Sequence, residues 1–523
     1  MIPARRPLVR KVLASLLVLG ATTTGLGVTA SGVAGASTDG STLSGEGGTF
    51  LQPVITKLVG DASSNLDGLY GSYVATGLDP GIADFIGTAP GAFNADFAVS
   101  ERPLTTAEAA TATTDGRPFA YVPIAATPVA IGTLAPSSSY DGSATINSAQ
   151  LCPHIEMTVP DVGAVFGLDS ADPVANWADS RFTCTNGQTI SQTGVILAAN
   201  DDPTMANYAL MALMDSDPTA MGYFSAALTQ DLPLNDATTS STAPSEKWPY
   251  SGNAGTYVIA GGDQPFIGKL LTINASNNVP SNIAANWVLG ATFPVSSVWT
   301  GAPLGAAWDI PTVALQNAAG AYVAPSTAAA KAAEADATLA STSDPTTNNL
   351  VTFNASTTDA AAYNNYMMEE TYLVVPTTGL PANKDTALAD FIRFALGPKG
   401  QTDIESFGAA PATSAMDAAG LKVAAALDAQ AALSSSSTTA TTTASSTASG
   451  GSTTTTSASG STGGVASSSD GGVGGTSGSS GTSGSGLAFT GAGAVVPTAV
   501  VGAVLVMLGV LGRRKFRRRV AKP

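Results

Sequence analysis

The fold of this chain is decided by an apolar run, Phe119-Ala120-Tyr121-Val122-Pro123-Ile124-Ala125-Ala126-Thr127-Pro128-Val129-Ala130-Ile131, in which β-branched and aromatic residues favour an extended strand. Two shorter runs predict further buried strands, Thr371-Tyr372-Leu373-Val374-Val375-Pro376 and Val195-Ile196-Leu197-Ala198. Helical stretches lie between these runs and around them: Phe50 to Val59, Thr204 to Met214, Leu388 to Leu396 and Ala418 to Leu433. The alternation of strands and helices predicts a mixed α/β class.

The C-terminal end carries three features in order. Leu487-Ala488-Phe489-Thr490-Gly491 precedes an apolar run from Ala492 to Leu511, and seven basic residues follow Leu511. Roughly 20 apolar residues at ~1.5 Å each match a bilayer core of about 30 Å. Basic residues after a span favour the cytoplasmic side. We therefore expect a transmembrane helix over 492–511, a basic cytoplasmic tail over 512–523, and an extracellular location for everything before them.

The pentapeptide over 487–491 resembles a sortase sorting signal of the LPxTG type, in its LAxTG variant. The resemblance implies cleavage between Thr490 and Gly491 and attachment of Thr490 to cell-wall peptidoglycan by a sortase. An ordinary single-span anchor with a chance pentapeptide is the alternative interpretation.

The N-terminal end indicates export. Met1 to Lys11 contains four basic residues and no acidic one, an apolar segment runs from Val12 to about Val28, and Ala34-Gly35-Ala36 has the small-x-small pattern of a cleavage site. This pattern predicts a signal peptide over 1–36 that is removed, with a retained N-terminal anchor as the alternative. The expected location is the cell wall or cell surface, with the C-terminal membrane anchor present before sortase processing.

The charge balance is acidic. The chain has 22 Lys and Arg against 38 Asp and Glu, a formal net charge of −16. The predicted signal peptide carries four basic residues and the part beyond Thr490 carries seven, with no acidic residue in either, so processing would change −16 to −27. A field of this sign opposes binding to nucleic acid, and we expect no nucleic-acid partner.

Cys152 and Cys184 are the two cysteines of the chain. In an oxidising compartment they predict a disulfide across a loop of about 30 residues, with a contribution on the order of 3 kcal/mol. Two cysteines and the one histidine, His154, have no metal-ligand spacing, so no metal site and no cofactor are expected. His154 is predicted to be a local packing or surface residue.

Composition divides the remaining chain into two parts. Residues 434–486 are almost entirely Ser, Thr, Gly and Ala, and Asp470 is the one charged residue among them. Such a tract buries too little apolar surface to offset the entropy of ordering its backbone, which predicts a disordered, flexible linker or stalk. The globular part is predicted over 44–433.

The chemistry-bearing segments begin with Gly45-Glu46-Gly47-Gly48-Thr49-Phe50, which precedes a helix and exposes backbone N–H groups at its positive end. Such a loop alone is more often just a turn. Asp96-Phe97-Ala98-Val99-Ser100-Glu101-Arg102-Pro103-Leu104-Thr105 follows it, and then the strand-rich segment 119–134. Together they resemble the periplasmic phosphate-binding protein (PstS-like) of bacterial phosphate ABC transporters, in the type II periplasmic-binding-protein superfamily.

Later segments match that family in the same order: 157–167 with Asn176-Trp177, Trp248-Pro249 with Gly261-Gly262-Asp263, 314–320 with Val323-Ala324-Pro325-Ser326, and 371–376 with the helix through Phe391 and Phe394. The resemblance implies an α/β fold of two lobes that close about a hinge. Lobe I would comprise 44–133 and 370–430, and lobe II would comprise 134–369.

The resemblance also implies ligand contacts from five residues: Thr49, Phe50, Ser100, Glu101 and Thr204. Glu101 stands where the family has an Asp. Leu78 replaces a hydroxyl donor, Ala198 lies near the family's Arg, and Asp202-Pro203 departs from its Ser-Gly. Loss of an Arg removes a charge-assisted contact of about 1.5–3 kcal/mol, and Arg102 is the nearby cation. The ligand therefore stays open as phosphate or another small polar solute.

Three functional classes follow from these observations. The first is a wall-anchored solute-binding protein with an ABC permease as a candidate partner, and this is the function that we favour. The second is a wall-displayed adhesion or structural module with a degenerate cleft. The third, a hydrolase, lacks a Gly-x-Ser-x-Gly elbow, a His-Glu-x-x-His motif and a second histidine in the sequence, so we do not expect an enzyme.

Overall fold

A computed structural model of the chain describes residues 41–140, 145–167, 176–200, 203–228, 243–249, 256–259, 282–284, 291–300 and 310–445. The chain divides into two units, 1–450 and 451–523, and all described residues belong to the first. The predicted signal peptide, sortase motif, transmembrane helix and basic tail lie outside the described residues. Within the described ranges, no helix combines the length and the apolar character needed to cross a bilayer.

Thirteen of the described strands form one mixed sheet with two halves that share strand β4 (Phe119–Thr133). In the first half, β1 pairs in parallel with β2 and β3, and β16 pairs antiparallel with both β3 and β4. Their bounds are β1 (Ser41–Gly47), β2 (Leu69–Val74), β3 (Phe97–Ser100) and β16 (Met368–Pro376), with the short β17 (Ala410–Pro411) beside β4.

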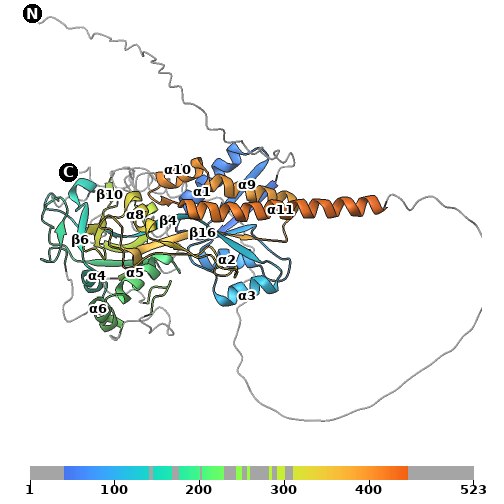
Figure 1. Cartoon of the computed structure of the whole chain (residues 1–523). Helices are drawn as coiled ribbons and strands as arrows, with labels where there is room; N and C mark the ends of the chain where they lie inside the picture. The colour runs from blue at the N-terminus through green and yellow to red at the C-terminus, as the bar shows by residue number, and fades with distance from the viewer. Residues whose placement is uncertain are drawn as a thin grey trace, which may run out of the picture. The chain divides into compact units, whose positions relative to one another are not determined.

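Helices cover both faces of this first half (Figure 1). On one face the core includes apolar residues of α1 (Gln52–Asn65), α9 (Ala382–Leu396) and α11 (Ser414–Ser445), and α10 (Pro398–Ser406) follows α9. On the other face it is formed by α2 (Leu78–Ile86) and α3 (Thr106–Thr114). Successive side chains of β16 point to opposite faces of the sheet, as in any strand. Leu373 and Val375 therefore lie in the first core, and Tyr372 and Val374 lie in the second.

Strand β4 passes from one half of the sheet to the other. Its residues 119–128 pair with β16, and its residues 129–133 pair with β11 (Ala291–Ser296). The register against β16 shifts between Thr371 and Tyr372, beside Pro123, which has no N–H to donate to the ladder. The two halves of the sheet are thus held on one continuous strand.

The second half of the sheet consists of β8 (Ile196–Asn200), β9 (Thr256–Ile259), β11, β12 (Thr312–Gln316), β13 (Tyr322–Val323), β6 (His154–Met157) and β7 (Thr183–Cys184). Its core also contains apolar residues of α4 (Val159–Phe166), α5 (Met205–Asp215), α6 (Pro218–Leu228) and α8 (Thr327–Ala335). Phe166 and Phe224 each make an edge contact with the buried Trp248 ring, at 5.9 Å between ring centroids.

Short elements complete the described fold. They are β5 (Thr145–Asn147) paired with β10 (Asn282–Ala284), β14 (Thr338–Leu339) paired with β15 (Val351–Thr352), and the 3₁₀ turns η1 (Ser148–Gln150), η2 (Ser297–Trp299) and η5 (Asn365–Met367). The mixed α/β class is confirmed, as are the three strands that the apolar runs predict. The predicted helices correspond to α1, α5, α9 and α11, with shifted ends.

One predicted boundary is wrong. Helix α11 continues to Ser445, whereas the Ser/Thr-rich linker was expected to begin at 434. Between Leu421 and Ser445 the sequence has no Gly or Pro, so a helix that is docked by its first turns can extend through Ala, Ser and Thr. Ser435 donates its hydroxyl hydrogen to the carbonyl of Ala431, four residues earlier, at 2.9 Å. Residues 446–486 lie outside the described residues.

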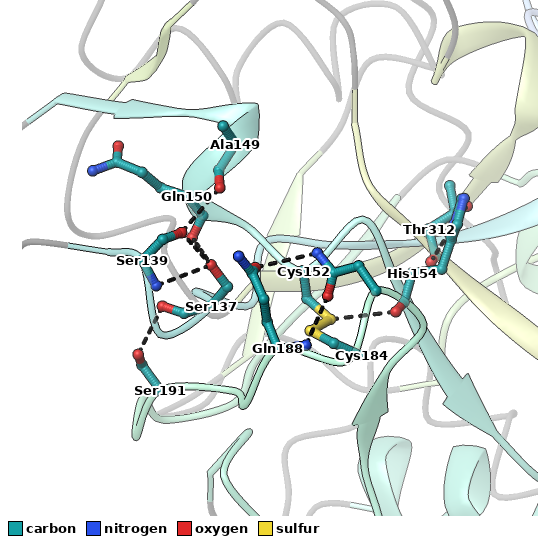
Figure 2. The surroundings of a disulfide bond; sticks show 11 residues. Ser137, Ser139, Ala149, Gln150, Cys152, His154, Cys184, Gln188, Ser191 and Thr312 are labelled. Carbon is teal, nitrogen blue, oxygen red and sulfur yellow. Dashed lines mark hydrogen bonds between the residues drawn. A yellow bond between two sulfur atoms is a disulfide. The ribbon is translucent and has the colours of Figure 1, made fainter.

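The predicted disulfide is confirmed, and it joins the segment before β6 to β7 (Figure 2). The Cα atoms of Cys152 and Cys184 are 5.6 Å apart, and both residues are buried. Cys152 Sγ lies 3.3 Å from the carbonyl oxygen of His154, and His154 Nδ1 lies 3.1 Å from both the carbonyl and the hydroxyl oxygen of Thr312. His154 therefore has a local role between β6 and β12. Within the described ranges, no cluster of His, Cys, Asp and Glu has the arrangement of a metal site.

Candidate functional site

The loop between β1 and α1 packs tightly against the end of β3. Gly47 has φ +154°, and a Cβ there would lie 2.1 Å from the carbonyl oxygen of Val99. A Cβ on Gly48 would lie 2.3 Å from Oε2 of Glu101, so a larger residue at this position would require the carboxylate to move. The Gly48 N–H donates to Val99 O at 3.1 Å, and the Tyr73 hydroxyl donates to Gly48 O at 2.5 Å. The loop that carries Thr49 and the Glu101 carboxylate are therefore neighbours.

Thr49 and Phe50 contact the second half of the sheet. The indole Nε1 of Trp299, in η2, donates to the carbonyl oxygen of Thr49 at 3.2 Å. Phe50 is buried and belongs to the same apolar cluster as Val129 and Ile131 of β4. Its side chain is thus part of the core, which leaves the backbone of this loop as the part able to meet a ligand.

Ser100 and Thr204 use their hydroxyls within the chain. The buried Ser100 Oγ donates to the carbonyl of Arg102 at 2.6 Å and accepts from its N–H at 3.3 Å, which closes the turn after β3. Thr204 is the N-cap of α5, where its hydroxyl accepts from the Asn207 N–H at 3.3 Å. The Thr204 N–H donates to the carbonyl of Glu246 at 2.9 Å.

Two of the predicted departures from the phosphate-binding pattern occupy core positions. Leu78 begins α2 and is buried with Ile82 and Phe85, and Ala198 is buried in β8. Neither side chain carries a hydrogen-bond donor. Asp201 and Asp202 lie outside the described residues.

Arg102 is surrounded by carboxylates. Its guanidinium lies 2.8 Å from Asp79 Oδ1, 2.8 Å from Glu108 Oε2 and 2.9 Å from Glu246 Oε1. Burial opposes the charge of Arg102, but these three partners outweigh burial and raise its pKa. Its positive charge is thus already matched by three side chains of the chain itself, and it leaves little net attraction for an anionic ligand.

A cavity of about 470 Å³ lies beside this cluster. Its wall comes from the β3–α3 turn, α5, the segment around β15, and the beginning of β16. The charged lining residues among the described ones are Glu101, Arg102, Glu246, Glu369 and Glu370. The apolar and aromatic lining residues include Met205, Tyr208, Leu350, Phe353, Met368 and Tyr372. Of the predicted ligand residues, the structure places Glu101 on this wall.

Three carboxyl groups of this wall, those of Glu246, Glu369 and Glu370, have a raised pKa. Burial raises the pKa of Glu246, and Arg102 offsets only part of that effect. Removal from water, followed by the charges of Glu101 and Glu246, raises the pKa of Glu369 well above its usual range. Burial and the charge of Glu334 likewise raise the pKa of Glu370, against a smaller lowering by the Ala125 backbone N–H.

Glu370 is the most unusual of these residues. Its side chain is 3% exposed, and apart from the small effect of the Ala125 backbone N–H its carboxyl oxygens have no hydrogen-bond partner within the described residues. Buried polar groups nearly always have such partners. A buried carboxyl group with so few donors is more stable with a bound proton than as an ion.

Sequence reasoning missed the three glutamates Glu246, Glu369 and Glu370. Glu369 and Glu370 are adjacent and come immediately before the apolar run 371–376. An acidic pair at the entrance of a buried strand is a visible signal, because carboxylates are rarely placed there without a partner. No pattern in the sequence around Glu246 indicates that it lines a cavity. Its position depends on the hydrogen bond between its carbonyl and the Thr204 N–H at the start of α5.

No protein-family model matches the chain, and no curated protein matches it in sequence. Among solved structures, the chain is similar to a DING protein, with 17% identity, a TM-score of 0.49, and coverage of 72% of this chain and 93% of the other. It is also similar to the high-affinity periplasmic phosphate-binding protein PfluDING, with 17% identity, a TM-score of 0.47, and coverage of 72% and 92%. A phosphate-binding protein from Stenotrophomonas maltophilia has 15% identity, a TM-score of 0.48, and coverage of 73% and 93%. At these identities and scores the similarity is coarse.

Proposed function

We propose that this chain is an exported solute-binding protein that holds phosphate or another small polar solute in the cavity beside Arg102. The observation that supports this proposal most directly is the cavity of about 470 Å³, which has the size of a small-molecule site. Its wall combines residues that follow β3 of the first half of the sheet with Met205 and Tyr208 of α5, which lies beside the second half. A few charged groups among apolar side chains are typical of a site that orients one small ligand.

We further propose a two-lobed arrangement with the hinge along β4 and the beginning of β16. The sharing of β4 between the two halves of the sheet supports this, since a strand common to both halves lets them move together or apart about a fixed connection. The lobe limits proposed are 44–133 with 370–430, and 134–369. Closure would bring α5 toward the turn at Arg102 and bury the solute.

The proposed location is the cell wall. In this proposal the signal peptide 1–36 directs export, a sortase cleaves between Thr490 and Gly491, and Thr490 is then joined to peptidoglycan. An ABC permease is the proposed receiver of the solute. A Thr490→Ala chain should stay in the membrane fraction, whereas the native chain should be released from the wall by muramidase. Equal release of the two chains would contradict sortase attachment.

A second candidate function is a wall-displayed adhesion or structural module with a degenerate cleft. The specific observation in its favour is that the hydroxyls of Ser100 and Thr204, both expected to meet a ligand, form hydrogen bonds within the chain. Under this alternative the cavity holds no solute.

Titration calorimetry of the full chain separates these two candidates. The panel contains inorganic phosphate, sulfate, spermidine, arginine and glucose. We expect at least one of them to bind, and binding to be lost in Thr352→Trp, because the exposed Thr352 lines the cavity and an indole there would fill its mouth. The matched control is Thr111→Trp, on the exposed side of α3. If no solute binds, or if Thr352→Trp binds like the native chain, the cavity is not the site.

A further inference from the structure

A second cavity, of about 230 Å³, lies at the end of strand β12 and shares no lining residue with the cavity beside Arg102. Its wall comes from the turn after β12, the first residues of α4, the connection between α5 and α6, and the 3₁₀ turn η5. It is smaller than the roughly 300–1,000 Å³ of sites for drug-sized ligands. This second cavity therefore has room for one small ring.

The wall of the second cavity is polar but almost uncharged. Among the described residues that line it, Asp217 is the one charged side chain, and the other polar side chains carry amide or hydroxyl groups. Oδ1 of Asp217 already accepts from the N–H groups of Thr219 and Ala220, at 2.8 Å and 3.0 Å. An anion would meet this carboxylate without a basic partner, and a cation would find one carboxylate that the start of α6 already uses. A neutral ligand with several hydrogen-bonding groups fits this wall best.

Two of the amides on this wall form a rigid frame. Nδ2 of Asn364 donates to the carbonyl of Gln316 at 2.9 Å. Nδ2 of Asn317 donates to the carbonyl of Ala362 at 2.8 Å, and its Oδ1 accepts from the N–H of Ala321 at 3.0 Å. These bonds hold the segment around η5 against the end of β12, so the wall is ordered before a ligand arrives.

Asn365 supplies the observation that points to a ligand. It lines the second cavity, it is 8% exposed, and its Nδ2 donates to the carbonyl of Asn354. Its Oδ1 has no hydrogen-bond partner within the described part of the chain. Because a carbonyl fixes the amide nitrogen, the open atom is the acceptor. A buried acceptor without a partner costs free energy, so this oxygen indicates a ligand that donates a hydrogen bond.

Tyr366, the next residue, lines the same cavity and is 40% exposed. The negative face of an aromatic ring attracts the C–H groups on the apolar face of a sugar, whose O–H groups stay free for polar neighbours. We propose that the second cavity binds one unit of a neutral saccharide, with a hydroxyl donating to Asn365 Oδ1 and the sugar ring packed on Tyr366. This site is separate from the proposed solute cavity and does not depend on it.

The test is saturation-transfer nuclear magnetic resonance and titration of the full chain with galactose, N-acetylglucosamine and the trimer of N-acetylglucosamine. We expect at least one of these sugars to bind, and to bind equally well to Thr352→Trp, in which the other cavity is filled. Tighter binding of the trimer than of the monomer would identify a glycan chain as the source of the unit, and equal binding a free monosaccharide. If no sugar binds, the cavity holds only solvent and the inference is wrong, while the proposed solute binding stands. If Thr352→Trp abolishes binding, the sugar belongs to the other cavity and the inference is equally wrong.

Two pairs of variants locate the sugar. Ala318 and Ala319 are adjacent exposed residues of the turn after β12; Ala318 lines the cavity, and Ala319 is not part of its described wall. Ala318→Trp should fill the mouth of the cavity and abolish binding, and Ala319→Trp should bind like the native chain. Tyr366→Ala should weaken binding about threefold to tenfold, whereas Tyr70→Ala, at an exposed tyrosine of β2, should not. Equal affinity in Ala318→Trp and Ala319→Trp would overturn the inference.

Deoxy forms of the sugar that binds test the acceptor at Asn365 without a change in the protein. Removal of the hydroxyl that donates to Oδ1 should weaken binding about tenfold or more, because the buried acceptor again lacks a partner. Removal of a hydroxyl that faces solvent should have a smaller effect. If every deoxy form binds as tightly as the parent sugar, Asn365 does not hold a hydroxyl and the inference is wrong.

Discussion

Two buried acidic regions of this protein differ in how the chain satisfies them. At Asp96 both carboxylate oxygens lie 2.8 Å from Lys384 Nζ, and Oδ2 also accepts from the N–H of Ser44 at 2.9 Å and from its hydroxyl at 3.2 Å. At Glu370, by contrast, the Ala125 backbone N–H has only a small effect, and neither carboxyl oxygen has a side-chain donor within the described residues. The Asp96 carboxylate is surrounded by donors that stabilise its charge. The Glu370 carboxyl group is instead stabilised by a bound proton.

Glu334 extends the second region behind the wall. It is 3% exposed, it is an electrostatic neighbour of Glu370, and its Oε1 has no hydrogen-bond partner within the described ranges. Burial raises its pKa to about 8, against a lowering by the Thr413 backbone, with a further increase from Asp417. The region at Asp96 therefore stabilises the fold through charge, whereas the region at Glu334 and Glu370 is stable mainly when protonated.

The largest expected effect is at the satisfied region. Asp96→Ala should lower the free energy of unfolding by about 3–5 kcal/mol, because it leaves Lys384 and Ser44 without their buried acceptor. Urea denaturation at pH 7 measures this loss. Asp67→Ala, at an exposed position, is the control and should change the value by less than about 0.5 kcal/mol. Similar losses of unfolding free energy in Asp96→Ala and Asp67→Ala would contradict the stabilising role of the Asp96 carboxylate.

The second effect depends on pH. A carboxyl group whose folded-state pKa is raised stabilises the fold below its unfolded pKa, and this contribution is lost as pH rises through the folded pKa. For Glu334 the window runs from its ordinary 4.5 to about 8. The free energy of unfolding should fall across it by up to roughly 4 kcal/mol, and Glu334→Gln should remove most of that fall. A native chain of equal stability at pH 5 and pH 8.5 would contradict the assignment.

The third effect belongs to the scaffold away from both regions. Replacement of Cys152 and Cys184 together by Ser should lower the free energy of unfolding by about 3 kcal/mol, because the open chain regains the entropy of a loop of about 30 residues. The loss should be the same at pH 5 and pH 8, in contrast to the effect of Glu334. Denaturant titration at the two pH values checks both statements. A loss that varies with pH would link the disulfide to the acidic region.

The smallest effect on stability separates binding from folding. Tyr208 is 38% exposed on α5 and lines the cavity, so Tyr208→Ala should change the free energy of unfolding by less than about 0.5 kcal/mol. It should nevertheless weaken binding of the solute several-fold, since it removes part of the cavity wall. Denaturation and calorimetry on the same preparation give both numbers. A large loss of stability would show that Tyr208 is a core residue rather than a binding residue.

The sequence predicted much of the fold because strand periodicity and apolar runs are local signals. The strand at 119–131, the buried strand at 371–376 and the helix near 204–214 all appear at nearly the expected positions. The disulfide followed from counting cysteines in an exported chain. The end of α11 could not be predicted, because Ser and Thr form either linkers or helices, and docking of the first turns decides between them.

The candidate site was less predictable, because it depends on contacts between distant segments. The proximity of Glu101 and Gly48 is visible only when β1 and β3 pair. The hydroxyls of Ser100 and Thr204 were expected to face a ligand, yet their geometry shows local caps and turns, a use that short polar side chains have in many proteins. The engagement of Arg102 by three carboxylates depends on α2, α3 and the segment at Glu246, which no sequence motif brings together.

Nuclear magnetic resonance of the carboxyl carbon of Glu370, followed as a function of pH, tests the central claim most directly. In the native chain the pKa of Glu370 should lie well above the ordinary Glu value of about 4.3, because burial and the charge of Glu334 disfavour its ionised form. In Glu334→Gln the pKa of Glu370 should fall, since that substitution removes the charge that helps to raise it. An ordinary pKa in the native chain, or a raised pKa that Glu334→Gln leaves unchanged, would contradict the account of Glu334 and Glu370 as a region that is stable when protonated.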